Sequence, residues 1–259
     1  MKKFTLKKSY LFFSSFFIVA LSMPFVFAKS KPMGNNPYAI TAVSAKSMAV
    51  ANEMIAREHL YDSLKLGSLG LAKQAFDYGM EGLAFMKEMG KVENYNIISI
   101  VDFSRASSQK RLYILDLKNC KVLFNTYVAH GMNSGKEFAQ NFSNDPSSNK
   151  SSLGFYETLG TYMGEHGYSL KLEGLEKGIN DNANKRDIVM HGAEYVGAQT
   201  VRDHGYIGRS WGCPAIPQAL HVPIIEKIKN GTCLFIYSPD KNYLSHSALL
   251  KQASPSVVL

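Results

Sequence analysis

The sequence predicts an α+β fold in which an N-terminal helical segment precedes a mainly β domain. Apolar residues recur at helical spacing up to about residue 89, and short runs rich in β-branched and aromatic residues begin at about residue 94. One further helical pattern follows near the end of these runs. The 259 residues are 46% hydrophobic and 19% charged, which is enough apolar material for one sizeable core.

Residues 1–28 have the pattern of a secretory signal peptide. Lysines at positions 2, 3, 7 and 8 precede an apolar run over residues 10–27, and Val26 and Ala28 occupy the −3 and −1 positions of a cleavage site. The alternative is an uncleaved membrane anchor, because the run approaches the length of a short spanning helix. A proline inside the run and polar residues after it favour cleavage. We therefore expect an exported protein of the periplasm or cell wall, with a flexible leader over residues 29–37.

The formal net charge is +8 at pH 7, and the four signal lysines account for half of it. The remaining basicity suits a partner rich in carboxylates or phosphates, such as a bacterial wall. The sequence has no arginine-rich run with interleaved aromatic residues and no nucleic-acid-binding motif. We expect no nucleic-acid partner, membrane contact only through the signal segment, and a monomer.

Residues 38–93 form the predicted helical segment. Its first half carries apolar residues at helical spacing, namely Ala42, Met48, Ala49, Met54 and Ile55. After a break at residues 62–70, the pattern resumes with Ala75, Tyr78, Ala84 and Phe85. We predict two or three helices packed on the following domain, with the methionines filling core space.

Residues 94–238 form the predicted β domain, and residues 239–259 are a weakly patterned tail. Strands are expected at residues 97–103, 111–117, 122–128, 154–158, 169–172, 187–191 and 232–237. The second and third of these should form a hairpin. Residues 131–152 are predicted to be a long loop, and a loop of this length in a compact domain is often functional. A helix is expected over residues 217–229, ended by Asn230-Gly231.

Cys213 is the candidate nucleophile. It lies between Gly212 and Pro214, which suit a turn that presents a side chain and are poor choices for a central strand. His191 ends a strand-like run and precedes Gly192, so it can supply the imidazole that a cysteine nucleophile needs. The alternatives are a buried small hydrophobe for Cys213 and a satisfied strand-end histidine for His191.

Ordered blocks of sequence carry a family resemblance. The main blocks are Val189-Met190-His191-Gly192-Ala193, Ser210-Trp211-Gly212-Cys213 and Gly231-Thr232-Cys233-Leu234-Phe235-Ile236, with others at residues 128–131, 142–144, 151–156 and 169–176. Over about residues 94–238 the chain resembles the murein L,D-transpeptidase catalytic-domain family, as a divergent branch of it. It departs from the family pattern where Trp211 replaces a histidine and Ala215 an arginine.

The resemblance implies an exported cysteine acyltransferase that forms or remodels peptide cross-links of peptidoglycan by L,D-transpeptidation. Stem peptides are the implied partners, a Cys213 thioester the implied intermediate and His191 the implied base, with no metal or organic cofactor. Two alternatives stay open. Hydrolysis of the same thioester makes the protein an L,D-carboxypeptidase or related cysteine peptidase, and loss of catalysis makes it a wall-binding module.

Several neighbours of this pair are assigned to the same site. The backbone N–H groups of Gly212 and Cys213 are candidates for an oxyanion hole. Gly192 indicates close backbone approach. Ser210 is expected either to orient His191 or to hold the turn.

The remaining candidates are aromatic or cationic side chains. Trp211 is expected to form a substrate wall or simply to pack, and Arg186 and Arg209 are candidates for binding a substrate carboxylate. His204 is either a rival base or a solvated loop residue. Two further histidines, His130 and His166, each precede a glycine, and either the cleft or turn chemistry explains them.

The other two cysteines are Cys120 and Cys233. A disulfide between them is open as an alternative, but two buried thiols is the interpretation we favour. The seven histidines are scattered, without a Cys-x-x-Cys or His-x-x-x-His pattern, so we expect no metal.

Overall fold

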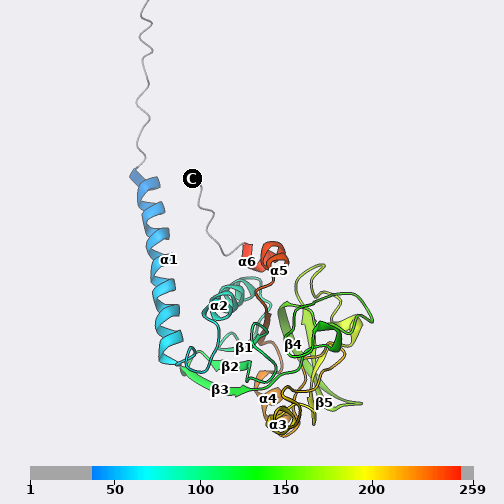
Figure 1. Ribbon diagram of the computed structural model, residues 1–259. Coiled ribbons are helices and arrows are strands. Elements are labelled where there is room, and N and C mark those ends of the chain that lie inside the picture. The colour runs from blue at the N-terminus through cyan, green and yellow to red at the C-terminus, as the bar shows by residue number, and fades with distance from the viewer. Residues whose placement is uncertain (1–36, 252–259) are drawn as a thin grey trace, which may run out of the picture. The chain divides into compact units, whose positions relative to one another are not determined.

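The computed structural model describes residues 37–251 (Figure 1). The predicted signal peptide lies outside the described residues. The chain divides into two units, Met1–Lys46 and Ser47–Leu259, and the description that follows concerns the second. Within residues 37–251, no helix is both long and apolar enough to cross a bilayer.

The core of the domain is one eight-stranded sheet in the order β3-β2-β1-β8-β4-β5-β6-β7. Its strands are β1 (Ile97–Asp102), β2 (Leu112–Asp116), β3 (Lys121–Thr126), β4 (Gly154–Gly164), β5 (Gly167–Gly174), β6 (Val189–Ala193), β7 (Ile216–Pro217) and β8 (Cys233–Tyr237). Every residue of β1, β2, β6 and β8 is buried, which explains their nearly continuous apolar runs.

The last strand in the sequence lies in the middle of the sheet. Strand β8 pairs in parallel with β1, with Ile100 opposite Phe235, and antiparallel with β4, with Phe155 opposite Phe235. The hairpin of β4 and β5 then leads to β6, where Ser169 lies opposite His191. This pairing places the strand that carries His191 beside the hairpin.

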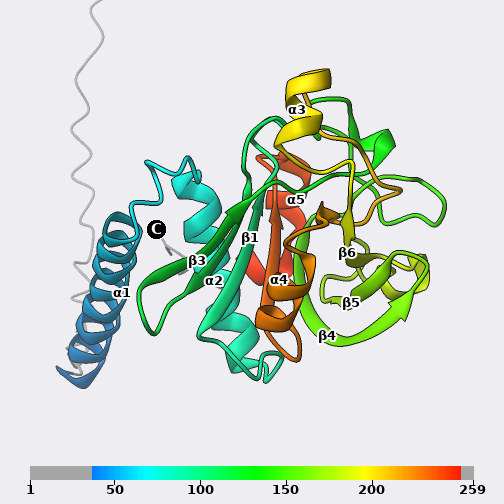
Figure 2. The same cartoon turned by 90° about the horizontal axis from the view of Figure 1, so that it is seen from below.

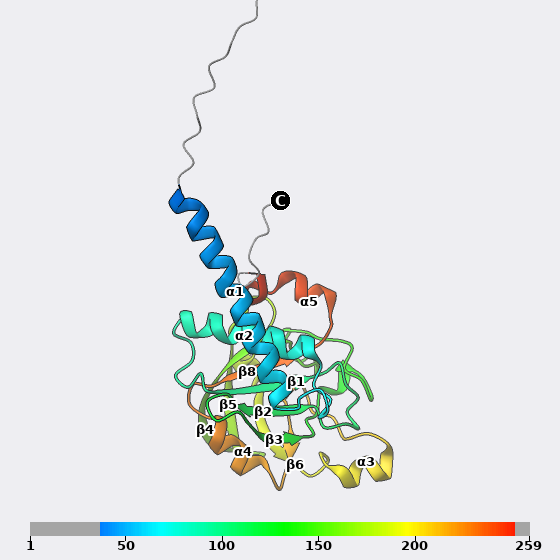
Figure 3. The same ribbon diagram turned by 90° about the vertical axis from the view of Figure 1, so that its left-hand side faces the viewer.

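Helices cover both faces of the sheet (Figure 2). The helices are α1 (Pro37–Ser63), α2 (Lys73–Glu88), α3 (Ala198–His204), α4 (His221–Ile228), α5 (Lys241–His246) and α6 (Ala248–Lys251). Helices α2 and α4 lie on opposite faces, and α5 and α6 lie on the same side as α2 (Figure 3). Helix α2 comes close to the sheet because Gly79 and Gly82 lie on its buried face.

The predicted fold class is confirmed: an N-terminal helical segment precedes a mainly β domain. Several boundaries were wrong. Strand β6 begins at Val189, because Asp187 has a left-handed backbone with φ of 53°. Helix α4 begins only at His221, because Ile216 and Pro217 pair with β6 instead. Helix α3 was not predicted.

The tail after residue 238 is also more ordered than expected. Asp240 caps helix α5 by accepting the N–H of Tyr243 at 2.7 Å. The buried carboxylate of Glu176 accepts hydrogen bonds from the hydroxyls of Tyr243 and Ser247, so the tail is attached to the end of β5. The buried side chains of Leu249 and Leu250 join the hydrophobic core, so polar and apolar tertiary contacts together fix this segment.

Two expectations about side chains need correction. The methionines fill the core only in part: Met86 is buried on α2, whereas Met48 and Met54 are 63% and 65% exposed on α1. All three cysteines are free thiols, so no disulfide joins Cys120 to Cys233. Only Cys233 is buried; Cys120 lies exposed in the turn between β2 and β3, with φ of 48°.

Candidate active site

Most of the predicted site residues line one cleft of about 560 Å³. They are Cys213, His191, Ser210, Trp211, Arg209 and Arg186. Strand β6, the segment before it, the turn before β7 and the tip of the β4–β5 hairpin form the walls. The structure thus brings Cys213 and His191, the predicted nucleophile and base, into the same cleft.

The turn that presents Cys213 depends on a glycine and a serine. Gly212 has φ of +128°, and a side chain there would meet the Lys150 carbonyl oxygen at 2.8 Å and Ile188 at 2.9 Å. The Ser210 hydroxyl donates to the Cys213 carbonyl at 2.6 Å and accepts the Gly212 N–H at 3.1 Å. Ser210 therefore holds the turn, the second of its two expected roles.

The same bonds narrow the choice of oxyanion donor. The Gly212 N–H is engaged by Ser210, which removes it from the expected pair of donors. The Cys213 N–H has no acceptor among the described residues, so it stays a candidate oxyanion donor.

The long loop predicted over residues 131–152 is hydrogen-bonded to the backbone of this turn. The Ser210 N–H donates to the His130 carbonyl at 3.0 Å, and the Met132 N–H donates to the Ser210 carbonyl at 2.7 Å. The Ser151 hydroxyl donates to the Gly212 carbonyl at 3.3 Å. Both ends of the loop therefore fix the backbone that carries the thiol.

The thiol of Cys213 is half-buried and hydrogen-bonded to backbone groups. Its Sγ accepts the Val189 N–H at 3.5 Å and donates to the Asp187 carbonyl at 3.6 Å. Burial raises the pKa of the Cys213 thiol, while the Val189 N–H and the nearby Arg186 charge act in the opposite direction. Among the described residues no hydrogen bond joins the thiol to His191.

The imidazole of His191 is buried at the end of β6. Its Nδ1 lies 3.0 Å from the Gly192 carbonyl, which assigns the ring proton to Nδ1 and leaves Nε2 as an acceptor. Burial lowers the pKa of His191, the Gly192 carbonyl opposes this, and the neighbouring His166 and His221 lower it further. The ring is therefore neutral at pH 7.

The tip of the β4–β5 hairpin adds Tyr162 and Glu165, which the sequence did not assign to the site, and His166, for which the cleft was one of two explanations. Tyr162, Glu165 and His166 line the cleft, and the His166 ring stacks on that of His191 with centroids 4.3 Å apart. Gly164 and Gly167 pair across a two-residue turn, and this spacing was the available signal for a hairpin. His130, by contrast, is buried with Nδ1 at 2.7 Å from Arg111.

The structure corrects the expectation for Arg186. Its guanidinium donates to the Ser143 and Lys150 carbonyls at 2.8 and 2.6 Å, and to the Ser152 and Ser148 hydroxyls at 2.5 and 3.2 Å. These donors hold the long loop and are not free to grip a substrate carboxylate. The charge still lies close enough to Cys213 to oppose the rise that burial causes in the pKa of its thiol.

The other candidates have distinct positions. Trp211 lines the cleft and is 75% exposed, and Arg209 is exposed and contacts the Met132 and Gly135 carbonyls through Nη1 alone. His204 is exposed at the end of α3 and does not line the cleft. Gly192 does make a close approach, because a side chain there would meet His221 at 2.7 Å.

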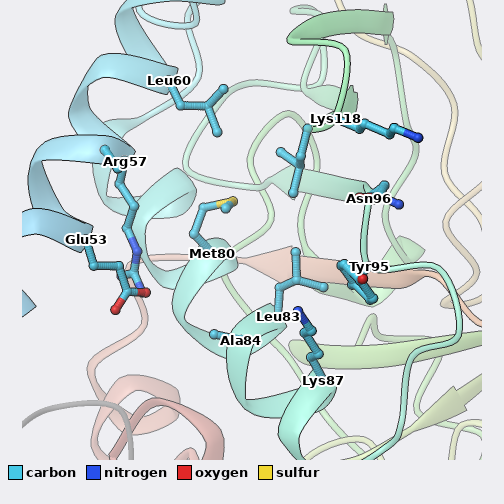
Figure 4. A pocket seen from close by; sticks show the side chains of 12 residues that line it. Glu53, Arg57, Leu60, Met80, Leu83, Ala84, Lys87, Tyr95, Asn96 and Lys118 are labelled. Carbon is cyan, nitrogen blue, oxygen red and sulfur yellow. The ribbon is translucent and has the colours of Figure 1, made fainter. Parts of the chain in front are cut away.

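A second pocket of about 410 Å³ lies between α1, α2 and the adjoining sheet (Figure 4). Apolar side chains such as Leu60, Met80 and Leu83 form most of it, and Arg57 and Lys87 lie at its edge. It has no thiol or imidazole among its lining residues, so it does not compete as a site for nucleophilic catalysis. Across residues 37–251, no three His, Cys, Asp or Glu side chains are grouped to hold a metal ion.

Residues 68–237 match the protein family described as L,D-transpeptidase catalytic domain, and the chain belongs to this family. The cleft with Cys213 and His191 lies within the matched residues. No curated protein sequence matches the chain.

Solved structures with some similarity include an L,D-transpeptidase from Mycobacterium smegmatis, at 10% identity and a TM-score of 0.34, over 55% of this chain and 59% of that one. Mycobacterium tuberculosis L,D-transpeptidase 1 is 9% identical with a TM-score of 0.30, over 55% and 62%. An L,D-transpeptidase from Xylanimonas cellulosilytica DSM 15894 is 13% identical with a TM-score of 0.32, over 70% and 93%. The chain thus spans about three-fifths of the two mycobacterial structures.

Proposed function

We propose that the protein is an exported cysteine acyltransferase that forms or remodels peptidoglycan cross-links by L,D-transpeptidation. One observation carries the chemistry: the thiol of Cys213 and the imidazole of His191 line the same cleft. Family membership supports the reaction class. The lysine-rich start and apolar run of the sequence support export.

Acylation of Cys213 starts the reaction. Its Sγ attacks the carbonyl of an L residue that is followed by a D residue, and Nε2 of His191 takes the thiol proton. The Cys213 N–H donates to the oxyanion of the tetrahedral intermediate. The C–N bond then breaks, His191 returns its proton to the departing amine, and a thioester remains on Cys213.

An amine of a second stem peptide resolves the thioester. It attacks the thioester carbonyl while His191 accepts its proton, and the C–S bond breaks. The sulfur leaves as a thiolate and regains the proton from His191. One amide bond has then been exchanged for another, so no cofactor or external energy source is required.

Trp211 and Arg209 are the proposed substrate contacts. Trp211 offers a flat, exposed indole at the edge of the cleft, which suits packing against the peptide stem. Arg209 uses only Nη1 for protein carbonyls and so keeps donors for a substrate carboxylate.

Incubation with a purified disaccharide-tetrapeptide, followed by mass spectrometry, tests the proposal. The expected products are cross-linked dimers and a released D-amino acid, and Cys213→Ala should form neither. Shortened monomers without dimers would assign hydrolysis instead. A carbapenem, which acylates reactive thiols, should add one adduct to Cys213; absence of both adduct and turnover would leave a wall-binding module.

A further inference from the structure

The base His191 lacks a carboxylate partner among the described residues. Its Nδ1 donates only to the carbonyl of the next residue, Gly192, at 3.0 Å. In a catalytic triad a third group orients the base. A single hydrogen bond to an adjacent carbonyl does not fix the plane of the His191 ring. The side chains that pack against the two ring faces therefore determine its orientation.

His166 provides that packing from a different strand. Its ring lies on the ring of His191 with centroids 4.3 Å apart and planes 20° apart. The contact is fixed by the backbone, because Ser169 pairs with His191 and its hydroxyl donates to the Gly167 carbonyl at 3.1 Å. The tip of the β4–β5 hairpin is therefore attached to the strand that carries the base.

We propose that His166 is a positioning residue for His191, holding the plane of its imidazole so that Nε2 stays directed to the cleft. The proposal rests on the assignment of His191 as the base. His166 is exposed and has no hydrogen bond to another described residue, so neither core packing nor a polar network explains its position. Stacking on the base is its one described interaction with another side chain.

A second consequence concerns charge. His166 lowers the pKa of His191, as does His221, which faces it from α4. The other titratable groups that line the cleft are Tyr162, Glu165, Arg186, Asp187, Tyr195, Arg209 and Cys213. Removing the imidazole of His166 should therefore raise the pKa of His191, while a neutral ring in its place should preserve the stack without the charge.

Two substitutions in the full mature chain separate these effects, with Met163→Ala as the matched control. Met163 is 76% exposed on the same hairpin and does not line the cleft. His166→Ala should lower kcat about 10- to 100-fold with little change in KM, because small misplacement of a reacting group can cost about 10²-fold. His166→Phe should recover most of kcat.

The pKa of His191 is measured separately, by NMR titration of its imidazole without substrate. It should rise in both His166 variants and stay unchanged in Met163→Ala. Kinetics and a titration like those of the control would overturn the proposal, as would a higher KM with normal kcat, the mark of a substrate contact. Absence of turnover in the wild-type protein would contradict the proposed function instead. In that case the NMR titration still tests the stacking role, which is overturned if the pKa of His191 is the same in the His166 variants as in the wild type.

Discussion

Cys213 and His191 have opposite pKa shifts for the same physical reason, the loss of water around each side chain. Burial disfavours a thiolate, which raises the thiol pKa, and it disfavours an imidazolium, which lowers the imidazole pKa. The resting pair is therefore uncharged rather than a thiolate–imidazolium ion pair. In the proposed reaction the proton moves during attack on the substrate, so the position of the His191 ring matters at that step.

The pH dependence of turnover should report the lowered pKa of His191. Because the pKa of His191 is lowered, the ring stays deprotonated below the ordinary value of 6.5, and activity should persist there. The acid limb of kcat/KM should accordingly have its midpoint below pH 6.5. A midpoint clearly above this value, measured from pH 4 to 8, would contradict the burial of the base.

The choice between His191 and His204 is testable by substitution. His191→Ala should lower kcat by about 10²–10⁴, the typical contribution of a positioned acid–base group. His204→Ala should leave kcat nearly unchanged, because His204 is exposed and outside the cleft. Steady-state kinetics on both variants, with circular dichroism to check folding, decides the roles. They are reversed if the His204 variant is the inactive one.

Trp211 should act in binding rather than in proton transfer. Trp211→Phe keeps a flat ring and should retain most activity, whereas Trp211→Ala should mainly raise KM. The pH profile of both variants should still report one imidazole base. A Phe variant as inactive as Cys213→Ala would show that the indole N–H takes part in the chemistry.

At the scale of secondary structure elements, α2 packs so close to the sheet that a side chain at one of its positions would not fit. A side chain at Gly82 would overlap the ring of Phe155. That ring stacks on Phe235 at 4.2 Å and so has little room to move. At Gly79 the nearest atom is the end of the flexible Ile100 side chain, 3.1 Å away.

Gly82→Ala should therefore lower the free energy of unfolding by about 1–3 kcal/mol, as overpacking does. Gly79→Ala is the control and should change the stability little. The higher helix propensity of alanine, worth about 1 kcal/mol, can offset the milder crowding at position 79. Urea denaturation of both variants measures the difference. Equal stability of Gly82→Ala and the wild type would show that α2 can move away from the sheet.

The elements that the sequence predicted well are those with a strong local pattern. Strands such as Ile97–Asp102 and Cys233–Tyr237 are short apolar runs buried on both faces, and the turn around Cys213 is marked by Gly212 and Pro214. Helix α3 was missed because it has no buried residue and hence no apolar period. The sequence left the choice between cleft and turn open for His166, because the pairing of β5 with β6, which brings it to His191, has no local signal.

At the scale of the whole molecule, the tail after residue 238 stabilises the core. The carboxyl of Glu176 is buried, which raises its pKa, and the hydroxyls of Tyr243 and Ser247 together with the Phe155 N–H satisfy it. Loss of the tail removes the two hydroxyl donors from the buried carboxyl of Glu176. An unsatisfied buried polar group costs about 1–3 kcal/mol.

Deletion of residues 239–259 should therefore lower the melting temperature by several degrees, since about 1 kcal/mol shifts the Tm of a domain of this size by about 2–4 °C. Glu176→Gln in the shortened chain should recover part of the loss, because an amide is cheaper to bury than a carboxylate. Differential scanning calorimetry makes the comparison. An unchanged Tm on deletion would show that the tail is dispensable.

The central position of β8 has a consequence for synthesis of the protein. Until the ribosome has made residues 233–237, β1 and β4 each lack a neighbour, and the sheet exists only as two separate parts with exposed edges. The turn with Cys213 is already complete by then, but no continuous sheet supports it. A nascent chain of this protein therefore cannot complete the sheet behind the Cys213 turn before residues 233–237 have been translated.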